Sequence, residues 1–159
     1  MEDILRLLEK DARFTPHQLA AMTGYSEDEV AEKLRECEEK NVVLGYTALV
    51  DWDKVDPDNV SALIEVKIAP QRGDGFDRIA ERIYQFEEVD SLYLMSGSFD
   101  LAVFITGRSI KEVSEFVFGR LAPIEGVTST ATHFILKKYK DKHRIFAVNE
   151  EQQERLLFT

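Results

Sequence analysis

Few residues of this sequence have the types and spacing that catalysis or metal binding needs. The imidazoles are those of His17, His133 and His143, and the single thiol is Cys37. General acid–base catalysis needs a positioned pair of titratable groups, and a zinc site needs clustered Cys and His ligands. Because neither pattern occurs, we expect no enzyme and no metal or other cofactor. A single cysteine also suits a reducing cytoplasm.

A second group with chemical potential is the run Gly97-Ser98-Phe99-Asp100, which lies between two predicted strands. Gly and Ser form turns readily, and Asp bonds its own backbone in turns. From the residues alone, a plain β-turn is the simpler interpretation of this run.

The elements of the first 50 residues indicate a helix-turn-helix. Apolar residues recur at helical spacing over 4–8, and Thr15-Pro16 is a typical helix start. After a turn at Gly24, Ser26 and Glu29 fit a capping box that starts a third helix.

Residues 42–44 and 46–50 are rich in β-formers on either side of Gly45. This pattern predicts a two-stranded hairpin, the wing of a winged helix-turn-helix. The acidic residues that follow, up to Pro57-Asp58, are typical of a linker.

The remainder predicts the order β-α-β-β-α-β, which is the ferredoxin-like split βαβ motif. Strands are expected at 61–69, 91–95, 101–106 and 128–138, and helices at 76–86 and 110–121. The expected fold class is therefore α+β: a winged helix-turn-helix followed by a ferredoxin-like βαββαβ domain. The domains that we expect are 1–50, a linker at 51–59, 60–140, and a C-terminal extension at 141–159.

The charge distribution limits what the first domain can do. The chain carries a net charge of −10, and residues 1–56 hold 7 Lys/Arg against 14 Asp/Glu. Phosphate contacts by cations supply most of the sequence-independent affinity for nucleic acid, so this acidity argues against tight DNA binding by the domain alone. The sequence has no run of about twenty apolar residues and no signal peptide, so we expect no membrane partner.

Nearly the whole chain resembles the Lrp/AsnC (feast/famine) family. The matching pieces are ILRLLEKDARFT, QLAAMTGYSEDEVAEKLRECEEKNVVLGYTALVD, YLMSGSFDLAVFI and GVTSTATHFILKKYK. The resemblance implies an effector-responsive, DNA-binding transcription regulator whose second domain is a RAM (ACT-like) sensing domain. It also implies homodimers that often assemble into octamers or hexadecamers, with amino acids bound at contacts between dimers.

In a helix-turn-helix, residues near the start of the second helix reach base edges. By resemblance, the residues that we expect at double-stranded DNA are Arg13, Thr15, His17, Ser26, Glu27, Asp28, Lys33, Arg35 and Lys40. Acids at the helix start accept a hydrogen bond from cytosine but cannot make the common bidentate guanine contact. Alternatively, they only stabilise the helix dipole. We expect weak, strongly salt-dependent binding per domain, which an oligomer would multiply.

The resemblance also places the effector pocket around the 97–100 run and so favours a binding site there over a plain turn. A backbone N–H at Gly97 or Ser98 can hold a ligand carboxylate, and Asp100 can pair with an α-amino group. The residues expected at the small-molecule effector, an amino acid by resemblance, are Met95, Gly97, Ser98, Phe99, Asp100, Thr128, Ser129 and Thr130.

Other functions stay open at this point. An acidic helix-turn-helix would fit a relative that has lost DNA binding, such as a sirohaem decarboxylase, although no acid–base pair stands out. An orphan sensor domain without a ligand is another alternative. RNA binding by the βαββαβ domain would need exposed aromatics after a basic-Gly start, which GSFDLAVFI lacks.

A basic cluster near the C-terminus has several interpretations. It consists of Lys137, Lys138, Lys140, Lys142 and Arg144. A solvated strand end is the simplest one. A role in DNA wrapping, or contact with the acidic N-terminal domain of a neighbour, are the alternatives.

Overall fold

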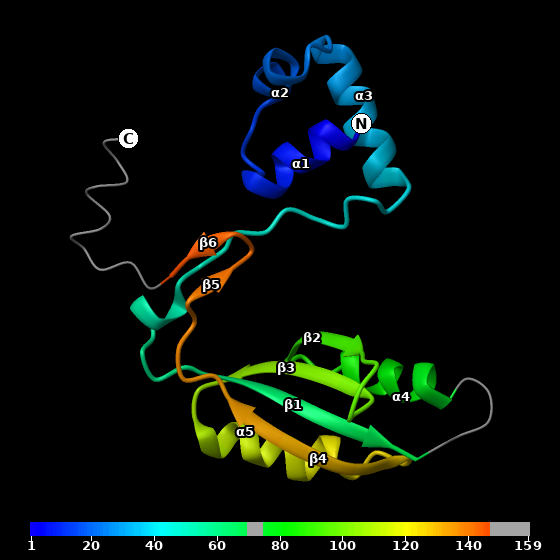
Figure 1. Cartoon of the computed structure of the whole chain (residues 1–159), viewed down its shortest axis with the longest axis vertical. Coiled ribbons are helices and arrows are strands. Elements are labelled where there is room, and N and C mark those ends of the chain that lie inside the picture. Colours follow the sequence, from blue (N-terminus) through cyan, green and yellow to red (C-terminus); the bar gives the residue numbers. More distant parts are fainter. Residues whose placement is uncertain (70–74, 147–159) are drawn as a thin grey trace. The chain divides into compact units, whose positions relative to one another are not determined.

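Three helices form in the first 50 residues of the computed structural model, which describes residues 1–69 and 75–146. They are α1 (Glu2–Lys10), α2 (Pro16–Thr23) and α3 (Glu27–Glu39). The predicted start signals lie where α2 and α3 begin. Gly24 ends α2 with a φ of 80°, a left-handed conformation that glycine adopts without a steric penalty. The helix-turn-helix is therefore confirmed (Figure 1).

A small apolar core holds these helices together. Ile4 of α1, Leu19 of α2 and Val30 of α3 are buried, and Leu34 packs against them. Each buried side chain of this size contributes about 1.5–3 kcal/mol. The residues Met1–Val50 form one unit, and the chain from Asp51 onward forms a second.

The predicted wing hairpin is wrong, because residues 42–50 form no strand in the structure. The backbone N–H groups of Val42 and Val43 instead donate to the carbonyl of Cys37, over 2.8 and 3.1 Å. They thus satisfy a carbonyl at the end of α3, where helices leave acceptors unpaired. An isolated two-stranded ribbon is marginal in water, so closing the helix end is the more favourable use of these groups.

The second unit contains the predicted order of strands and helices. Its elements are β1 (Val60–Ile68), α4 (Gly75–Tyr84), β2 (Val89–Leu94), β3 (Leu101–Gly107), α5 (Ile110–Phe116) and β4 (Val127–Phe134). A π-helical turn, η2 (Val117–Leu121), extends α5. The strands pair antiparallel in the order β2-β3-β1-β4, which confirms the ferredoxin-like arrangement and the α+β class.

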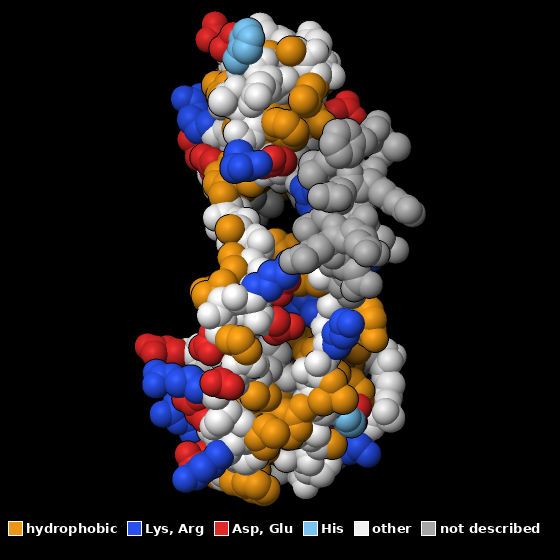
Figure 2. Space-filling model, turned by 90° about the vertical axis from the view of Figure 1, so that its left-hand side faces the viewer, with side chains coloured by type: hydrophobic (Ala, Val, Ile, Leu, Met, Phe, Trp, Pro, Cys, Tyr) orange, Lys and Arg blue, Asp and Glu red, His pale blue; other side chains and the backbone are white. Residues whose placement is uncertain are grey.

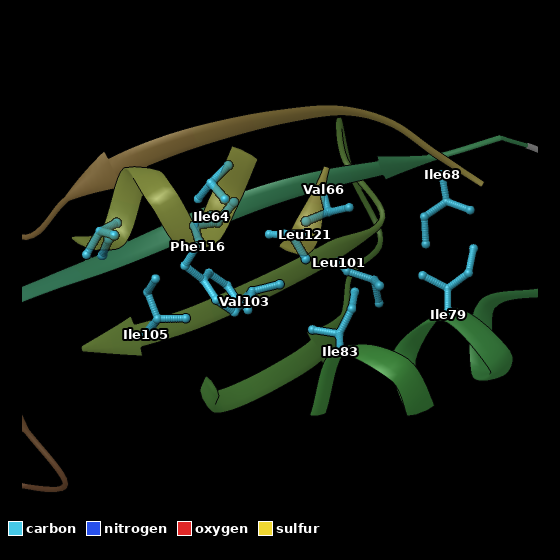
Figure 3. Close-up of a cluster of buried hydrophobic side chains, with 13 residues drawn as sticks. Ile64, Val66, Ile68, Ile79, Ile83, Leu101, Val103, Ile105, Phe116 and Leu121 are labelled. Carbon is cyan, nitrogen blue, oxygen red and sulfur yellow. The ribbon is translucent and has the colours of Figure 1, made fainter. Parts of the chain in front are cut away.

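One face of the sheet is covered by α4, α5 and η2. Alternate residues of β1 and β3, such as Ile64 and Val103, meet Ile79 and Ile83 of α4 and Phe116 of α5 in one buried cluster (Figure 3). Because side chains alternate along a strand, the residues between them lie on the opposite face, which these helices leave open (Figure 1).

Some predicted bounds differ in the structure. The helix predicted at 110–121 begins with an exposed Ile110, the first residue of α5, directly after the capping Ser109. β4 ends at Phe134 rather than Lys138.

The segments that flank the sheet also contain short elements. The expected linker holds a short 3₁₀ helix, η1 (Trp52–Lys54). After β4 comes a small hairpin of β5 (Lys140–Asp141) and β6 (Arg144–Ile145). The C-terminal extension from residue 147 lies outside the described residues. None of the helices in the described ranges is long and apolar enough to cross a membrane.

Candidate DNA interface and effector site

Two of the expected DNA-contacting residues, Thr15 and Ser26, already serve as helix caps. Ser26 Oγ accepts from the backbone N–H of Glu29 over 3.3 Å and donates to its carboxylate over 2.9 Å. That carboxylate also accepts from the Ser26 backbone N–H over 2.8 Å. The backbone and side-chain bonds from Ser26, followed by the charge of Lys33, lower the pKa of Glu29. Thr15 makes the equivalent capping box with Gln18. The hydroxyl of Thr15 thus caps α2, and the hydroxyl of Ser26 caps the recognition helix α3.

The acids at the start of α3 differ in their partners. Glu27 Oε1 lies 2.7 Å from Nδ1 of His17, which ties the recognition helix to the start of α2. Glu29 is held in the capping box. The carboxylate of Asp28 is exposed and has no ion pair or hydrogen bond with another described residue. Asp28 is thus the uncompensated charge at the helix start.

Three of the cations expected at DNA lie beside carboxylates of their own unit. Arg13 binds both oxygens of Asp11 over 3.1 and 3.0 Å. Arg35 lies 3.9 Å from Glu32 and 3.8 Å from Glu39, and Lys40 lies 3.2 Å from Glu36.

Lys33 differs from these cations because its Nζ lies over the ring of Tyr25, at 5.0 Å from the centroid. On the face that Figure 2 shows, cationic and acidic side chains are interspersed rather than gathered into one basic patch.

In the second unit, the segment 95–100 forms a closed hairpin loop between β2 and β3. The backbone N–H of Met95 donates to the carbonyl of Asp100 over 2.8 Å. Asp100 also joins the loop to β1: its N–H donates to the carbonyl of Val66 over 3.0 Å, and its Oδ2 accepts from the N–H of Ile68 over 2.7 Å. One carboxylate oxygen of Asp100 is therefore committed to the fold.

Strand β1 brings the two halves of the expected effector site to one end of the sheet. Val66 pairs with Leu101 on one side and with Thr130 on the other. The register shifts between Lys67 and Ile68, and there the hydroxyl of Thr128 donates to the carbonyl of Lys67 over 3.1 Å. Ser129 is exposed beside it. The hairpin loop and residues 128–130 thus flank the end of β1.

Nothing in the described part of the chain requires residue 97 to be glycine. Its φ lies outside the left-handed region, and a Cβ added there would meet nothing within 4 Å. A plain turn that needs glycine would show a positive φ. The empty space at an exposed backbone is what close approach of another molecule requires.

Sequence reasoning did not predict the groove beside this loop. A pocket of about 370 Å³ lies between α4 and the edge strand β2, and its walls include Phe76, Tyr84 and the carboxylate-bearing Asp77. Leu94 and Leu101, which flank the loop, also line it. No local motif marks these residues, because a helix and a strand must pack before the groove exists.

No group of three potential metal ligands occurs in the described part of the chain. A helix-turn-helix and a sheet domain whose loop leaves an exposed backbone and a carboxylate define a class of protein: a DNA-binding regulator with a ligand-binding domain. Residues 61–145 match the family model described as the Lrp/AsnC ligand binding domain, and residues 2–43 match a winged helix-turn-helix DNA-binding model. The chain belongs to the Lrp/AsnC family of transcriptional regulators.

Named relatives agree with this assignment. The chain is 43% identical over 152 residues to the HTH-type transcriptional regulator YugG of Bacillus subtilis, which covers 95% of this chain and 92% of that one. It is 30% identical over 137 residues to the transcriptional regulator LrpA of Pyrococcus horikoshii (86% and 94% covered).

Among solved structures, a feast or famine regulatory protein from M. tuberculosis complexed with L-methionine shares the fold, with a TM-score of 0.74 at 24% identity and 90% and 94% coverage. Because the named relatives are regulators, the sirohaem decarboxylase alternative is not favoured.

Proposed function

We propose that this regulator is a homo-oligomer whose assembly and DNA affinity respond to an amino acid bound at the loop 95–100. The observation that carries the proposal is the structure of the loop. Asp100 fixes the loop to β1, and the missing side chain of Gly97 leaves its backbone exposed with no atom within 4 Å of a Cβ position. The L-methionine in the mycobacterial relative supports an amino acid as the ligand class.

The loop supplies complementary groups for both ends of an α-amino acid. Backbone N–H groups at Gly97 and Ser98 can hold the carboxylate, and the oxygen of Asp100 that does not bind Ile68 can accept from the ammonium. Hydroxyls at 128–130 add donors and acceptors, and Met95 and Phe99 provide an apolar wall.

A second copy of the chain is the partner that we propose for the open face of the sheet. Leu63 and Phe104 are only half-buried there, and the exposed Tyr93 packs edge-on to Phe104 at 6.0 Å. Glu65 and His133 form a 3.3 Å pair on the same face. Covering this face with a second copy would give a homodimer. Dimers would then assemble into octamers or larger oligomers with the effector between them. Effector binding would thus be coupled to assembly.

The helix-turn-helix would bind DNA weakly in each copy, because its cations must leave their carboxylate partners. Exposed ion pairs of this kind contribute about 0–1 kcal/mol each. Exchanging a carboxylate partner for a DNA phosphate therefore costs little free energy but also gains little. We propose that the contacts with DNA are made around the start of α3 by the residues predicted from the sequence to lie at DNA. The cytoplasm is the compartment that we propose, because the DNA lies there.

A thermal-shift screen of the twenty amino acids, on protein of mass known from light scattering, tests the effector site. We expect at least one amino acid to raise the melting temperature and to change the assembled mass. A flat response to all of them would remove the sensor function.

Two variants in the loop and one control test whether that response arises at the loop. Gly97→Ala should fold normally, because its Cβ meets no atom of the chain, but it should weaken the ligand shift by filling the ligand's space. Asp100→Asn keeps an acceptor for Ile68 N–H and should lose the ammonium contact. Gly119→Ala is the matched control, since its Cβ also meets nothing, and it should respond like the unmodified protein.

A further inference from the structure

The chain carries its cations unevenly, and one short segment stands out. Residues 137–144 hold five Lys/Arg and one Asp, a net charge of +4 within a chain of net −10. The rest of the chain therefore carries −14. The segment falls within the hairpin of residues 137–146, called here the basic hairpin, which contains β5 and β6.

The basic hairpin holds several of these side chains in fixed places. Lys137 lies over the ring of Tyr139, and Lys138 lies over the ring of Phe146, each at 5.1 Å. The backbone N–H of Phe146 donates to the carbonyl of Tyr139 over 2.9 Å and lengthens the ladder. These contacts order the base of the hairpin rather than neutralise its charge.

The tip of the basic hairpin is charged and uncompensated. Lys140 and Lys142 are exposed and have no ion pair with any described residue. The acid of this segment, Asp141, lies 3.9 Å from Lys138. In the helix-turn-helix, by contrast, Arg13, Arg35 and Lys40 all lie beside carboxylates.

The turn at the tip is also costly for the residues that form it. Lys142 and His143 both adopt a positive φ, 41° and 67°, which a type I′ turn requires of its two central residues and which Asn-Gly satisfies best. Non-glycine residues in this region cost of order 1 kcal/mol each and persist mainly where function selects them. A turn selected for structure alone would favour Asn-Gly over a lysine and a histidine here.

We propose that the basic hairpin binds the phosphate backbone of DNA, independently of base sequence, with Lys140 and Lys142 as its main contacts. This inference rests on the DNA-binding function of the helix-turn-helix. The hairpin lysines would add to the cations of α3, where Arg35 lies beside carboxylates and Lys33 lies over the ring of Tyr25. Free lysines release counterions from DNA without first breaking an ion pair, so each adds about 0.9 to the slope of log affinity against log salt.

The test is fluorescence anisotropy of two labelled duplexes of equal length over a salt series, with the full-length protein. One duplex comes from the region upstream of the protein's own gene, and the other has an unrelated sequence. Lys140→Gln with Lys142→Gln should flatten the salt slope by up to about 0.9 per lysine and weaken binding roughly tenfold near 0.1 M salt. Both duplexes should be affected equally, because phosphate contacts carry no sequence information.

Two further variants separate charge from structure. Lys142→Asn with His143→Gly places the preferred residues in the turn, so the melting temperature should hold or rise while the salt slope still falls. Arg108→Gln with Lys111→Gln removes the same formal charge from exposed positions at the start of α5 and should keep the slope of the unmodified protein.

The experiment distinguishes failure of the hairpin proposal from failure of DNA binding by the protein as a whole. If the unmodified protein binds neither duplex, the DNA-binding function fails and the hairpin inference fails with it. If the unmodified protein binds and the lysine variants keep its slope, only the hairpin inference is overturned. A lower oligomer mass of these variants without DNA, at an unchanged slope, would instead assign the hairpin to a neighbour's acidic unit.

Discussion

Asp28 is the acid of the recognition helix that the fold leaves without a partner among the described residues. Glu27 lies beside His17 and Glu29 is held by Ser26, so their charges are partly satisfied within the unit. Asp28 therefore contributes most to repulsion if the start of α3 approaches DNA, and its removal should help binding.

Asp28→Asn should tighten binding to any duplex by about 0.5 kcal/mol, roughly twofold at low salt, because a screened like charge several ångströms away costs about that much. The same change should slightly lower thermal stability, since an acid in the first helical turn interacts favourably with the helix dipole. Anisotropy and thermal melts measure the two effects. Glu81→Gln, at an exposed position of α4, is the control. Weaker binding by Asp28→Asn would show that this carboxylate contacts a base.

For single residues, the sequence predicted local roles such as helix caps better than contacts between residues far apart in the chain. The caps at Thr15 and Ser26 were readable because both boxes are local in sequence. The contact of His17 with Glu27, ten residues apart, depends on how α2 and α3 pack. The anchor from Asp100 to Ile68 joins the start of β3 to the neighbouring strand β1, 32 residues away in sequence, so no spacing in the sequence indicates it.

The element that positions the DNA interface is α3, and its start depends on the capping box. Ser26→Ala should destabilise the first unit by about 1 kcal/mol, the usual cost of losing an N-cap. Far-ultraviolet circular dichroism during urea unfolding measures it. Ser96→Ala, at an exposed position in the loop of the second unit, is the control. Equal stability of both variants would mean that the cap is not formed.

Glu29 links this cap to pH. Its pKa is lowered in the folded chain, first by the backbone bond from Ser26, so its contribution to stability is present above the ordinary glutamate value of 4.5. That contribution is lost as the pH falls through the lowered folded-state pKa. The difference in the free energy of unfolding between the unmodified protein and Glu29→Gln should therefore be constant near neutral pH and should shrink as the pH falls into the acid range. A gap that widens in acid would contradict this assignment.

The element order was predictable because helical and strand periodicities are local properties of the sequence. The wing was not, because the backbone N–H groups of Val42 and Val43 can either pair in a short ribbon or donate to the carbonyl of Cys37 at the end of α3, as they do here. Local propensity does not decide between them. The groove between α4 and β2 is likewise a product of packing.

In the function that we propose for the whole molecule, net charge and assembly together set the affinity for DNA. The chain carries −10 overall, and the cations of its helix-turn-helix are largely paired with its own acids. In the homo-oligomer that we propose, many weak contacts made at once would supply the affinity for DNA through effective concentration. An effector that changes assembly would change DNA affinity by the same linkage.

The most direct measurement is a salt series of binding to the protein's own upstream DNA, with and without each amino acid, on protein whose mass is known from light scattering. We expect binding to fall steeply as salt rises, and its midpoint to shift when the effector changes the assembled mass. Absence of binding at low salt, with every amino acid and with the oligomer intact, would contradict the proposed function.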